Sequence, residues 1–477
     1  MRKREIKKFT GVLAALLSAF LWLFSPASGE GADTVSLFVP ETVRAYESGR
    51  IMLLSPAEGQ AELRLLDMLD NCWLTVSAFV QAGQNAIAWD GTGAYGEQLM
   101  SGTFRWQAEV RTAGGETLRA EHRFRIQGAV PTLVYALPSS ETLYLDGGEK
   151  WFVECFVTSE CRVEMEVLQG NECVFRKETT LKDEDGDTLS WAGKISGSTR
   201  IAPGEYTVRF RSKQNPGYAH VFPLTVEEKT PQLTLPESTG PILPERGMTD
   251  AEIWDIMRQP SVVIAGKGSF LRIDLYEKPS SRSAVIGSLR CATQALEVLG
   301  REGNWTRVRA WSHTDGQCVT GYIQTRKLTV ARPSGHYGVL VDKREQTLTL
   351  FEDGRAVATI PVSTGLAVGR DTYRETPAGA FLTDVHFAAS FAQEGYRYDY
   401  PLRYDAGNIL HSVGYLRRGT VSNGSAKDYG DMLPELGQKA SHGCVRISPF
   451  STPENPLNIY WLWTHLPYHT RVLILED

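Results

Sequence analysis

Two copies of one sequence pattern, 102 residues apart, limit what the first half of the chain can fold into. Trp89 precedes one glycine by two residues and a second, Gly102, by thirteen, and Trp191 stands in the same relation to a glycine and to Gly204. Apolar and polar residues alternate after each second glycine, which is the period of a half-buried strand. Repeats of about a hundred residues that contain such strands are typical of β-sandwiches. We therefore expect two tandem β-sandwiches, at residues 33–128 and 129–228.

The length and the charge of the chain narrow the class of protein. A chain of 477 residues is too long for one hydrophobic core, so we expect roughly three to four domains. The formal net charge is −6, without the basic surface that nucleic-acid binding needs. Nucleic acid is therefore excluded as a partner.

The first thirty residues have the pattern of an export signal. Five Lys and Arg residues precede the thirteen-residue apolar run Val12–Phe24, and small residues follow at 27–29. The run is short for a bilayer span, although an uncleaved membrane anchor is the alternative. We assign residues 1–29 to a signal peptide, which places the rest of the chain outside the cytoplasm.

The remaining sequence predicts further β domains. Pro231, Pro236, Pro241 and Pro244 mark a linker at 229–260. Within it, the segment 249–257 predicts a short helix from its N-cap, acidic first turn and apolar stripe. Short strands separated by turns follow at 261–332 and again across the final domain, 333–477, where 458–463 is a further helix candidate. The predicted fold class is mainly β and multidomain.

Seven cysteines, at positions 72, 155, 161, 173, 291, 318 and 444, would give an exported protein three disulfides and one free thiol. We expect pairing within the cluster at 155–173 and between residues 291 and 318, and the sequence leaves the connectivity open. Cys444 has a local context unlike that of the others.

The segment Ser441-His442-Gly443-Cys444-Val445-Arg446 carries the candidate chemistry. A cysteine is a good nucleophile as a thiolate, and a nearby histidine supplies the base that forms it. Gly443 leaves room for a carbonyl group beside Cys444. It also allows the N–H groups of both residues to point at one spot, as an oxyanion hole requires. A buried structural cysteine beside a surface histidine would give a similar pattern, so proximity alone leaves both interpretations open.

Two other kinds of site fit less well. His411, His442 and Cys444 could supply three zinc ligands, but no fourth Cys or His lies at ligand spacing, so we expect no metal. A serine hydrolase is excluded because the chain has no Gly-x-Ser-x-Gly elbow.

The last 140 residues resemble the L,D-transpeptidase catalytic (YkuD-type) domain. The resemblance rests on several separated motifs in the right order, which are Ser363–Gly365, Thr376–Phe381, Gly407–Leu410, His411-Ser412, Ser441–Cys444 and Arg446. The stretch from Ser412 to Ala440 is longer than is usual in this family, which indicates an inserted loop over the site.

Two histidines compete for the role of base. On a strand, His442 and Cys444 would face the same side but lie too far apart for direct contact. The resemblance implies instead that His411 is the base, brought from a neighbouring strand and oriented by the Ser412 carbonyl or side chain. It implies that His442 and Gly443 shape the oxyanion loop. We expect Ser441 and Arg446 to contact the substrate.

The upstream modules carry resemblances of their own. The two sandwiches resemble immunoglobulin-like modules of bacterial surface proteins, through the Trp-x-Gly and Gly-x-Tyr pattern. Residues 261–332 resemble a bacterial SH3-like barrel, through Gly303-Asn304-Trp305 and Gly321-Tyr322-Ile323. Binding of cell-wall polymer and a plain spacer role both remain open for these modules, since a fold does not give a function.

These resemblances imply an exported enzyme of the cell wall, or of the extracytoplasmic face of the membrane, that acts on peptidoglycan stem peptides without a cofactor. Cys444 would release D-Ala and pass the acyl group to the amine of a second stem, forming a 3→3 cross-link. Water as the acceptor would make the enzyme an L,D-carboxypeptidase. A non-catalytic wall-binding surface protein is the other alternative, and the intact Cys444, His411 and Gly443 argue against it.

Overall fold

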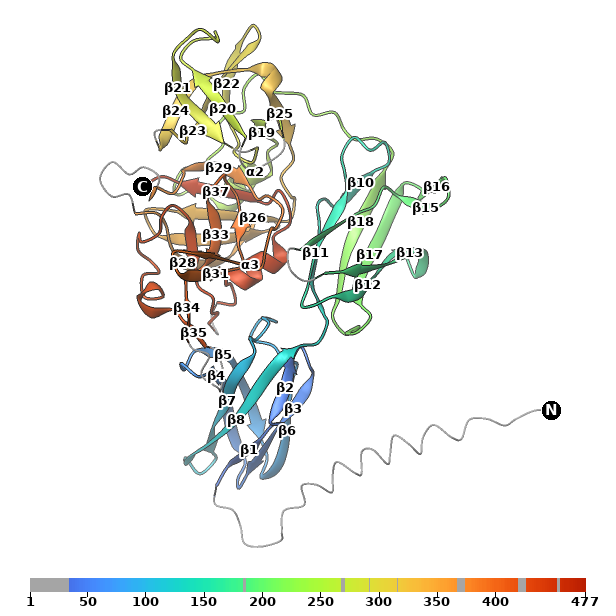
Figure 1. The fold of residues 1–477 in the computed structure, drawn as a ribbon, viewed down its shortest axis with the longest axis vertical. Coiled ribbons are helices and arrows are strands. Elements are labelled where there is room, and N and C mark those ends of the chain that lie inside the picture. Colours follow the sequence, from blue (N-terminus) through green and yellow to red (C-terminus); the bar gives the residue numbers. More distant parts are fainter. Residues whose placement is uncertain are drawn as a thin grey trace, which may run out of the picture.

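The computed structural model describes residues 34–182, 186–266, 271–290, 292–314, 316–366, 374–418, 426–452 and 455–477. The described chain is mostly β and folds as several units, as expected (Figure 1). The predicted signal peptide and Cys291 lie outside the described residues. Within them, no helix combines the length and the apolar character that crossing a membrane requires.

The two sandwiches have the same strand order. The first contains β1 (Ser36–Phe38), β2 (Thr42–Ala45), β3 (Gly49–Ser55), β4 (Gly59–Asp67), β5 (Cys72–Val80), β6 (Gly83–Trp89), β7 (Gly102–Thr112) and β8 (Thr117–Ala129). The second contains β9 (Leu133–Pro138), β10 (Thr142–Tyr144), β11 (Phe152–Val157), β12 (Cys161–Gln169), β13 (Glu172–Leu181), β14 (Asp187–Ser190), β15 (Lys194–Ser196), β16 (Thr199–Arg200), β17 (Gly204–Ser212) and β18 (Ala219–Glu227). Sheets β1-β3-β6 and β2-β8-β7-β4-β5 in the first correspond to β9-β11-β14 and β10-β18-β17-β12-β13 in the second. β8 continues to Ala129, one residue past the predicted boundary. The immunoglobulin-like assignment stays a prediction.

The repeated tryptophans occupy matching places. The indole N–H of Trp89 donates to the carbonyl of Thr92, and that of Trp191 donates to the carbonyl of Lys194, three residues on in both copies. Gly91 has φ of +80° after the first tryptophan, a conformation that favours glycine. The Trp-x-Gly motif is therefore a tight turn whose indole closes on its own backbone.

The expected disulfides within the cysteine cluster are not formed. Cys155, Cys161 and Cys173 are all free thiols. In the β12–β13 hairpin, Cys161 pairs with Leu181 whereas Cys173 pairs with Leu168, so the two cysteines are about seven residues apart along the strands. At roughly 3.3 Å per residue, this separation is far beyond the reach of a disulfide. Cys155 is buried in the core of the second sandwich instead.

The segment after the sandwiches contains the predicted helix and a small β unit. Its elements are α2 (Asp250–Arg258), β19 (Ser261–Ile264), β20 (Arg272–Tyr276), β21 (Val285–Arg290), β22 (Glu297–Glu302), β23 (Trp305–Ser312), β24 (Gln317–Gln324) and β25 (Leu328–Ala331). Thr249 caps α2 in a capping box with Glu252. The sheet runs in the order β21-β20-β24-β23-β22, with β19 paired to β25. Its SH3-like identity stays a prediction, and we refer to residues 261–332 as the barrel unit.

The C-terminal unit is built on one eight-stranded sheet. Its elements are β26 (Tyr337–Asp342), β27 (Thr347–Glu352), β28 (Arg355–Ser363), β29 (Gly379–Leu382), β30 (Ser390–Gln393), β31 (Tyr396–Asp399), β32 (Leu402–Arg403), β33 (Ile409–Ser412), β34 (Leu416–Arg418), β35 (Ala426–Asp428), β36 (Val445–Ile447), α3 (Ile459–His465) and β37 (Arg471–Leu475). The strand order is β29-β37-β26-β27-β28-β36-β33-β32. Trp463 of α3 shares a core with Val339 and Val341, whereas Trp254 of α2 packs with Leu340 between them. Because side chains alternate along a strand, the two helices cover opposite faces of the sheet.

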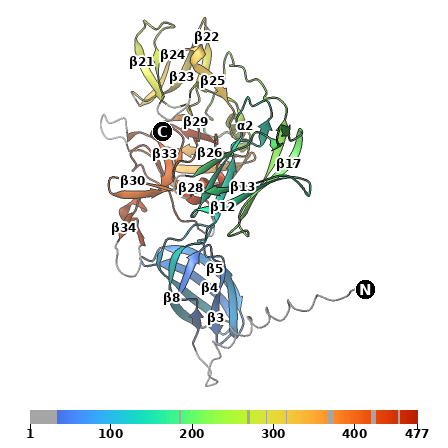
Figure 2. The same cartoon turned by 45° about the vertical axis from the view of Figure 1, so that its right-hand side comes forward.

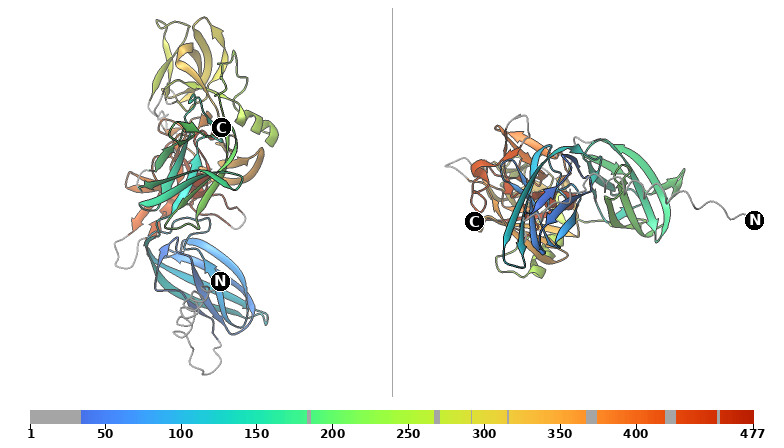
Figure 3. Two further views of the ribbon diagram at one scale, coloured as in Figure 1. Left: turned by 90° about the vertical axis from the view of Figure 1, so that its right-hand side faces the viewer. Right: turned by 90° about the horizontal axis from the view of Figure 1, so that it is seen from below.

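The other units surround this sheet. The barrel unit and the first sandwich lie at its two ends, and the second sandwich lies beside it (Figures 1 and 2). The view from below shows the second sandwich projecting to one side (Figure 3). Tyr135 and Phe156 of the second sandwich pack edge-on against Trp463 of α3.

The contact between the C-terminal unit and the first sandwich has an aromatic part, in which Trp73 and Phe450 pack edge-on, and a polar part. The side-chain amide of Asn458, the N-cap of α3, donates to the Glu97 carboxylate at 2.8 Å. Burial raises the pKa of Glu97, and the hydrogen bonds that it accepts work against this rise. The first sandwich and the C-terminal unit are therefore in direct contact.

Candidate active site

Two neighbouring strands bring the candidate catalytic residues together. β33 and β36 are parallel, with His411 opposite Arg446. Extending this register back by one residue places Cys444 opposite Ile409. The side chain of Ile409 faces the same side of the sheet as that of His411, because side chains alternate along β33. The thiol and the imidazole therefore share one face on adjacent strands.

The loop before β36 is closed by its own serine. The Ser441 hydroxyl donates to the Cys444 carbonyl at 2.5 Å and accepts the Gly443 N–H at 3.2 Å. Gly443 has φ of +111°, which favours glycine. The structure differs here from the expected oxyanion hole, because the Gly443 N–H is bonded inside the loop and does not join the Cys444 N–H at one spot.

Thr376 ties this loop to the strand that supports it. Its hydroxyl donates to the Gly443 carbonyl at 2.9 Å and accepts the Gly365 N–H at 2.7 Å. The Thr364 carbonyl accepts the Ser441 N–H at 3.0 Å. The flanking motifs around residues 363–365 and 376 therefore meet at the catalytic loop and hold its backbone.

His411 is positioned as a neutral base. Its Nδ1–H donates to the Ser412 carbonyl at 2.6 Å, and because a carbonyl only accepts, Nε2 keeps a free lone pair. The ring is 4% exposed, and Tyr398 and Phe391 pack edge-on against it. Burial lowers the pKa of His411 to about 4, opposed by the bond to Ser412 and assisted by the charge of Arg446. At neutral pH the imidazole is therefore uncharged and can accept a proton.

Cys444 is positioned as a protonated thiol. Its side chain is partly exposed, and its sulfur lies 4.0 Å from the Gly407 carbonyl. Burial raises the pKa of the thiol, while the Ile409 backbone and the charge of Arg446 act in the opposite direction. A neutral thiol beside a neutral imidazole can transfer its proton as the sulfur attacks a carbonyl.

The other residues of the sequence-based prediction are His442, Ser412, Ser441 and Arg446. His442 is exposed, and its ring has no hydrogen bond to the described parts of the chain. The Ser412 carbonyl, and not the hydroxyl, holds His411. Ser441 is 2% exposed, with its hydroxyl committed to the loop. Arg446 is 5% exposed and pairs at 2.9 Å with Glu435, which lies between Ser412 and Ala440, where an insertion stays a prediction. Substrate contact by Arg446 and Ser441 stays a prediction.

Several residues at the site are missing from the sequence-based prediction. Tyr398 packs on His411, and Asp399 donates its backbone N–H to the Ser412 hydroxyl at 2.7 Å. Tyr404 is fully buried, and its hydroxyl has no hydrogen-bond partner within the described chain. Burial raises the pKa of Tyr404, and a charge on Cys444 would raise it further. Tyrosines are common in β sheets, so no local pattern distinguishes Tyr398 or Tyr404, and none marks Asp399.

The barrel unit supports the loop beside the thiol. His313 Nε2 lies 2.8 Å from the Asp405 carboxylate, and Asp405 also accepts the Asn408 amide at 3.1 Å. The Thr293 hydroxyl donates to the Tyr404 carbonyl at 2.7 Å. The loop that contains Gly407 therefore has a brace outside its own domain.

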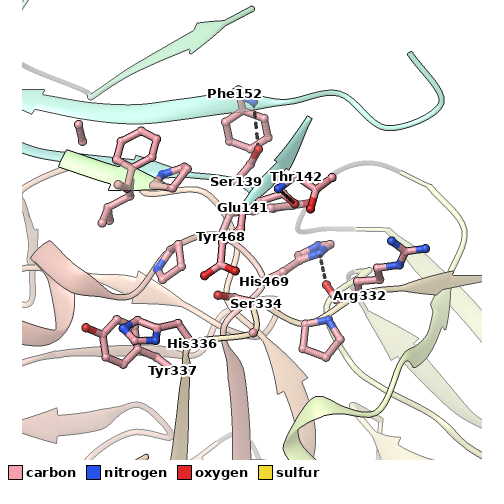
Figure 4. Close-up of a pocket in the computed structure, with 18 of the residues that line it drawn as sticks. Ser139, Glu141, Thr142, Phe152, Arg332, Ser334, His336, Tyr337, Tyr468 and His469 are labelled. Carbon is pink, nitrogen blue, oxygen red and sulfur yellow. Dashed lines mark hydrogen bonds between the residues drawn. The ribbon is translucent and has the colours of Figure 1, made fainter. Parts of the chain in front are cut away.

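A second concave region lies away from this chemistry. A cavity of about 1600 Å³ is bounded mainly by the second sandwich and the C-terminal unit, with smaller parts from the first sandwich, the linker and the end of the barrel unit. Neither Cys444 nor His411 lines it. Figure 4 shows the stacked Tyr468 and His469 in its wall, with the His469 Nδ1–H directed at the Arg332 carbonyl. This cavity lies where several units meet and does not reach the Cys444 loop.

Comparison with known proteins identifies the C-terminal unit. Residues 336–474 match the family model for the L,D-transpeptidase catalytic domain, YkuD. The chain is 27% identical over 171 residues to the Bacillus subtilis (strain 168) protein named "Putative L,D-transpeptidase YciB", an alignment that covers 33% of this chain and 80% of that protein.

Solved structures include similar proteins. An L,D-transpeptidase structure from Xylanimonas cellulosilytica is 28% identical, with a TM-score of 0.21, and the match covers 30% of this chain. This chain spans 63% of that structure, which is less than two thirds of its length. An L,D-transpeptidase from Mycobacterium smegmatis is 14% identical, with a TM-score of 0.22, and covers 57% of this chain and 92% of its own.

The family match contains every motif residue from the Ser363 segment to Arg446 and lies on the eight-stranded sheet that carries the thiol and the imidazole. Residues 336–474 of this chain therefore form an L,D-transpeptidase catalytic domain of the YkuD family.

Proposed function

We propose that this protein is an exported peptidoglycan L,D-transpeptidase that works through a thioester on Cys444. The observation that carries the proposal is the pairing of β33 with β36, which supports a shared face for the Cys444 thiol and the His411 imidazole in a domain that matches this family. Peptidoglycan stem peptides are the substrate class that the family match favours.

The residues divide the reaction in the following way. Cys444 Sγ attacks the carbonyl between the L-centre and the terminal D-Ala, and His411 Nε2 takes the thiol proton. The tetrahedral intermediate collapses, and His411 returns the proton to the leaving D-Ala amine. An amine of a second stem then attacks the thioester, loses its proton to His411 and releases Cys444 as the thiol. This sequence forms a 3→3 cross-link without a cofactor.

The decisive experiment uses the full chain. The purified protein is incubated with tetrapeptide muropeptides, and the products are identified by mass. A dimer that has lost one D-Ala supports cross-linking, whereas a tripeptide monomer alone would make the enzyme a carboxypeptidase. Unchanged muropeptides, together with no acyl adduct on Cys444, would refute the proposal and favour a non-catalytic wall-binding protein.

Localisation follows from the same proposal. An exported chain meets peptidoglycan outside the cytoplasm, in agreement with the signal pattern at 1–29. Fractionation of cells that express the full chain should recover the protein outside the cytoplasm. Retention in the cytoplasmic fraction would contradict it.

A further inference from the structure

A buried ion pair joins the segment between Ser412 and Ala440 to β31, the strand that packs beside His411. Lys427 of β35 lies 2.6 Å from the carboxylate of Asp399 of β31, and both residues are less than 9% exposed. The Lys427 ammonium also lies 4.9 Å from the ring centre of Tyr415, whose hydroxyl donates to Asp399 at 2.9 Å. The cation is therefore held on two sides within the catalytic domain.

Residues of the first sandwich contact Lys427 on a third side. The ring of Trp73 of β5 lies 5.3 Å from the Lys427 ammonium, and the Asn71 amide donates to the Lys427 carbonyl at 3.0 Å. Asp67 fixes both groups, because it accepts the indole N–H of Trp73 and the side-chain amide of Asn71. β34 and β35 lie against the end of the sandwich that carries β4 and β5 (Figure 1).

Asp399 continues the connection to the catalytic base. Its N–H donates to the Ser412 hydroxyl, and the Ser412 carbonyl accepts the Nδ1–H of His411. The residue before Asp399 is Tyr398, whose ring centre lies 4.8 Å from that of His411. A shift of Asp399 would therefore disturb both the hydrogen-bond acceptor and the packing of the imidazole.

The Lys427–Asp399 ion pair is better suited to fixing the geometry of the two strands than to stabilising the fold. A buried ion pair adds little stability compared with apolar residues of the same size, because both charges lose their hydration. Such a pair fixes geometry, since removal of one partner leaves a buried charge without compensation. The ammonium between two aromatic rings adds a directional cation–π contact.

We propose that the first sandwich is a positioning module for His411, acting through Trp73, Lys427 and Asp399. The inference rests on the proposed function only in taking His411 as the base for Cys444. Trp73 is a positioning residue and touches neither reacting atom. The docked sandwich sets the orientation of the imidazole, and with it the rate at which the thiol gives up its proton.

The test measures the reactivity of Cys444 in the full chain. Alkylation by iodoacetamide is followed by peptide mass, which separates Cys444 from the other cysteines. Trp73→Leu should slow alkylation at pH 7 by about 3- to 30-fold, the range expected of a residue that couples through a packed network. At about pH 10, where hydroxide removes the thiol proton without His411, the rates of the variant and the wild type should converge.

Two matched control variants distinguish a loss of His411 positioning from a general loss of stability in the first sandwich. Leu63→Ala creates a cavity in the core of the same sandwich, and Tyr46→Phe removes the hydroxyl contact with Tyr460 at the same interface. Both should keep the wild-type alkylation rate at pH 7, even where their thermal midpoints fall as far as that of Trp73→Leu. Equal slowing in Leu63→Ala, or slowing of Trp73→Leu at both pH values, would overturn the proposal.

A second variant covers the case in which Trp73→Leu does not fold. The double variant Lys427→Met with Asp399→Asn replaces the ion pair by neutral groups of similar size and should show the same pH-dependent slowing. A wild-type rate in this variant would also overturn the proposal. The wild-type protein is treated with a carbapenem in parallel. Absence of an acyl adduct there would refute the proposed function, while the alkylation rates would still decide the positioning role.

Discussion

The two sides of the catalytic pair are built in different ways. Cys444 sits on a loop whose bonds come from its own domain, through Ser441 and Thr376. His411 takes its orientation from Ser412 and Asp399, and Asp399 is bonded to a lysine that a different unit clamps. Changes in how the first sandwich docks should therefore affect the base before they affect the nucleophile.

The nucleophile side should show the largest effect. Cys444→Ala should abolish both turnover and covalent labelling by a carbapenem, because both need the sulfur. Intact-mass spectrometry of the wild type and the variant gives the measurement. Labelling of the variant to the wild-type extent would end the assignment of Cys444.

The base side should give the next largest effect. His411→Ala should slow acylation by about 10²-fold or more, since general-base help is typically worth that much. His442→Ala is the matched control and should stay close to wild type, because the ring is exposed. If the ranking of the two variants is reversed, then His442 is the base.

A smaller effect should follow from loosening the loop. Thr376→Val removes the hydroxyl that bonds both Gly443 and Gly365, and should lower the free energy of unfolding by about 1–3 kcal/mol. Thr376→Ser keeps the hydroxyl and should retain most of this stability. Chemical denaturation of the two variants gives the comparison, and equal losses would show that the hydroxyl is not what holds the loop.

The mildest perturbation is pH. His411 must be uncharged to act as a base, and burial lowers its pKa to about 4. Acylation should therefore persist as the pH falls through 6.5, the ordinary value for histidine, and reach about half near pH 4. A midpoint near 6.5 in the rate profile would show that the imidazole is more hydrated than its burial indicates.

The same pKa shift has a consequence for stability. The folded pKa of His411 lies below its unfolded value, so the unfolded chain binds more protons between about pH 4 and 6.5. The free energy of unfolding should therefore fall as the pH is lowered through this range. His469 is buried with the same direction of shift and should add to this loss.

The sequence predicts the nucleophile side well and the base side only in part. Ser441–Cys444 and the segments around residues 363 and 376 are short motifs, and the resemblance to a known catalytic domain rests on them. Their meeting at one loop appears only in the structure, where Thr376 and Gly443 are 67 positions apart. The contribution of Trp73 depends on its contact with Lys427, in a part of the chain more than 300 positions away, for which no local period exists. Asp399 contacts Lys427 and Ser412 over 28 and 13 positions, and no local pattern marks these contacts either. The sandwich repeat was visible because its tryptophans form turns within a few residues. The absence of a disulfide between Cys161 and Cys173 was not visible in the sequence, because the strand register separates two cysteines that are close in sequence.

The contact between Glu97 and Asn458 has a consequence for the order in which the molecule is assembled. The two residues are 361 positions apart. At about 5–20 residues per second, roughly 20 to 70 seconds of synthesis separate their appearance. The first sandwich has its own core and is complete long before the N-cap of α3 exists. The surface of the first sandwich that receives α3 is therefore made long before the helix that docks on it.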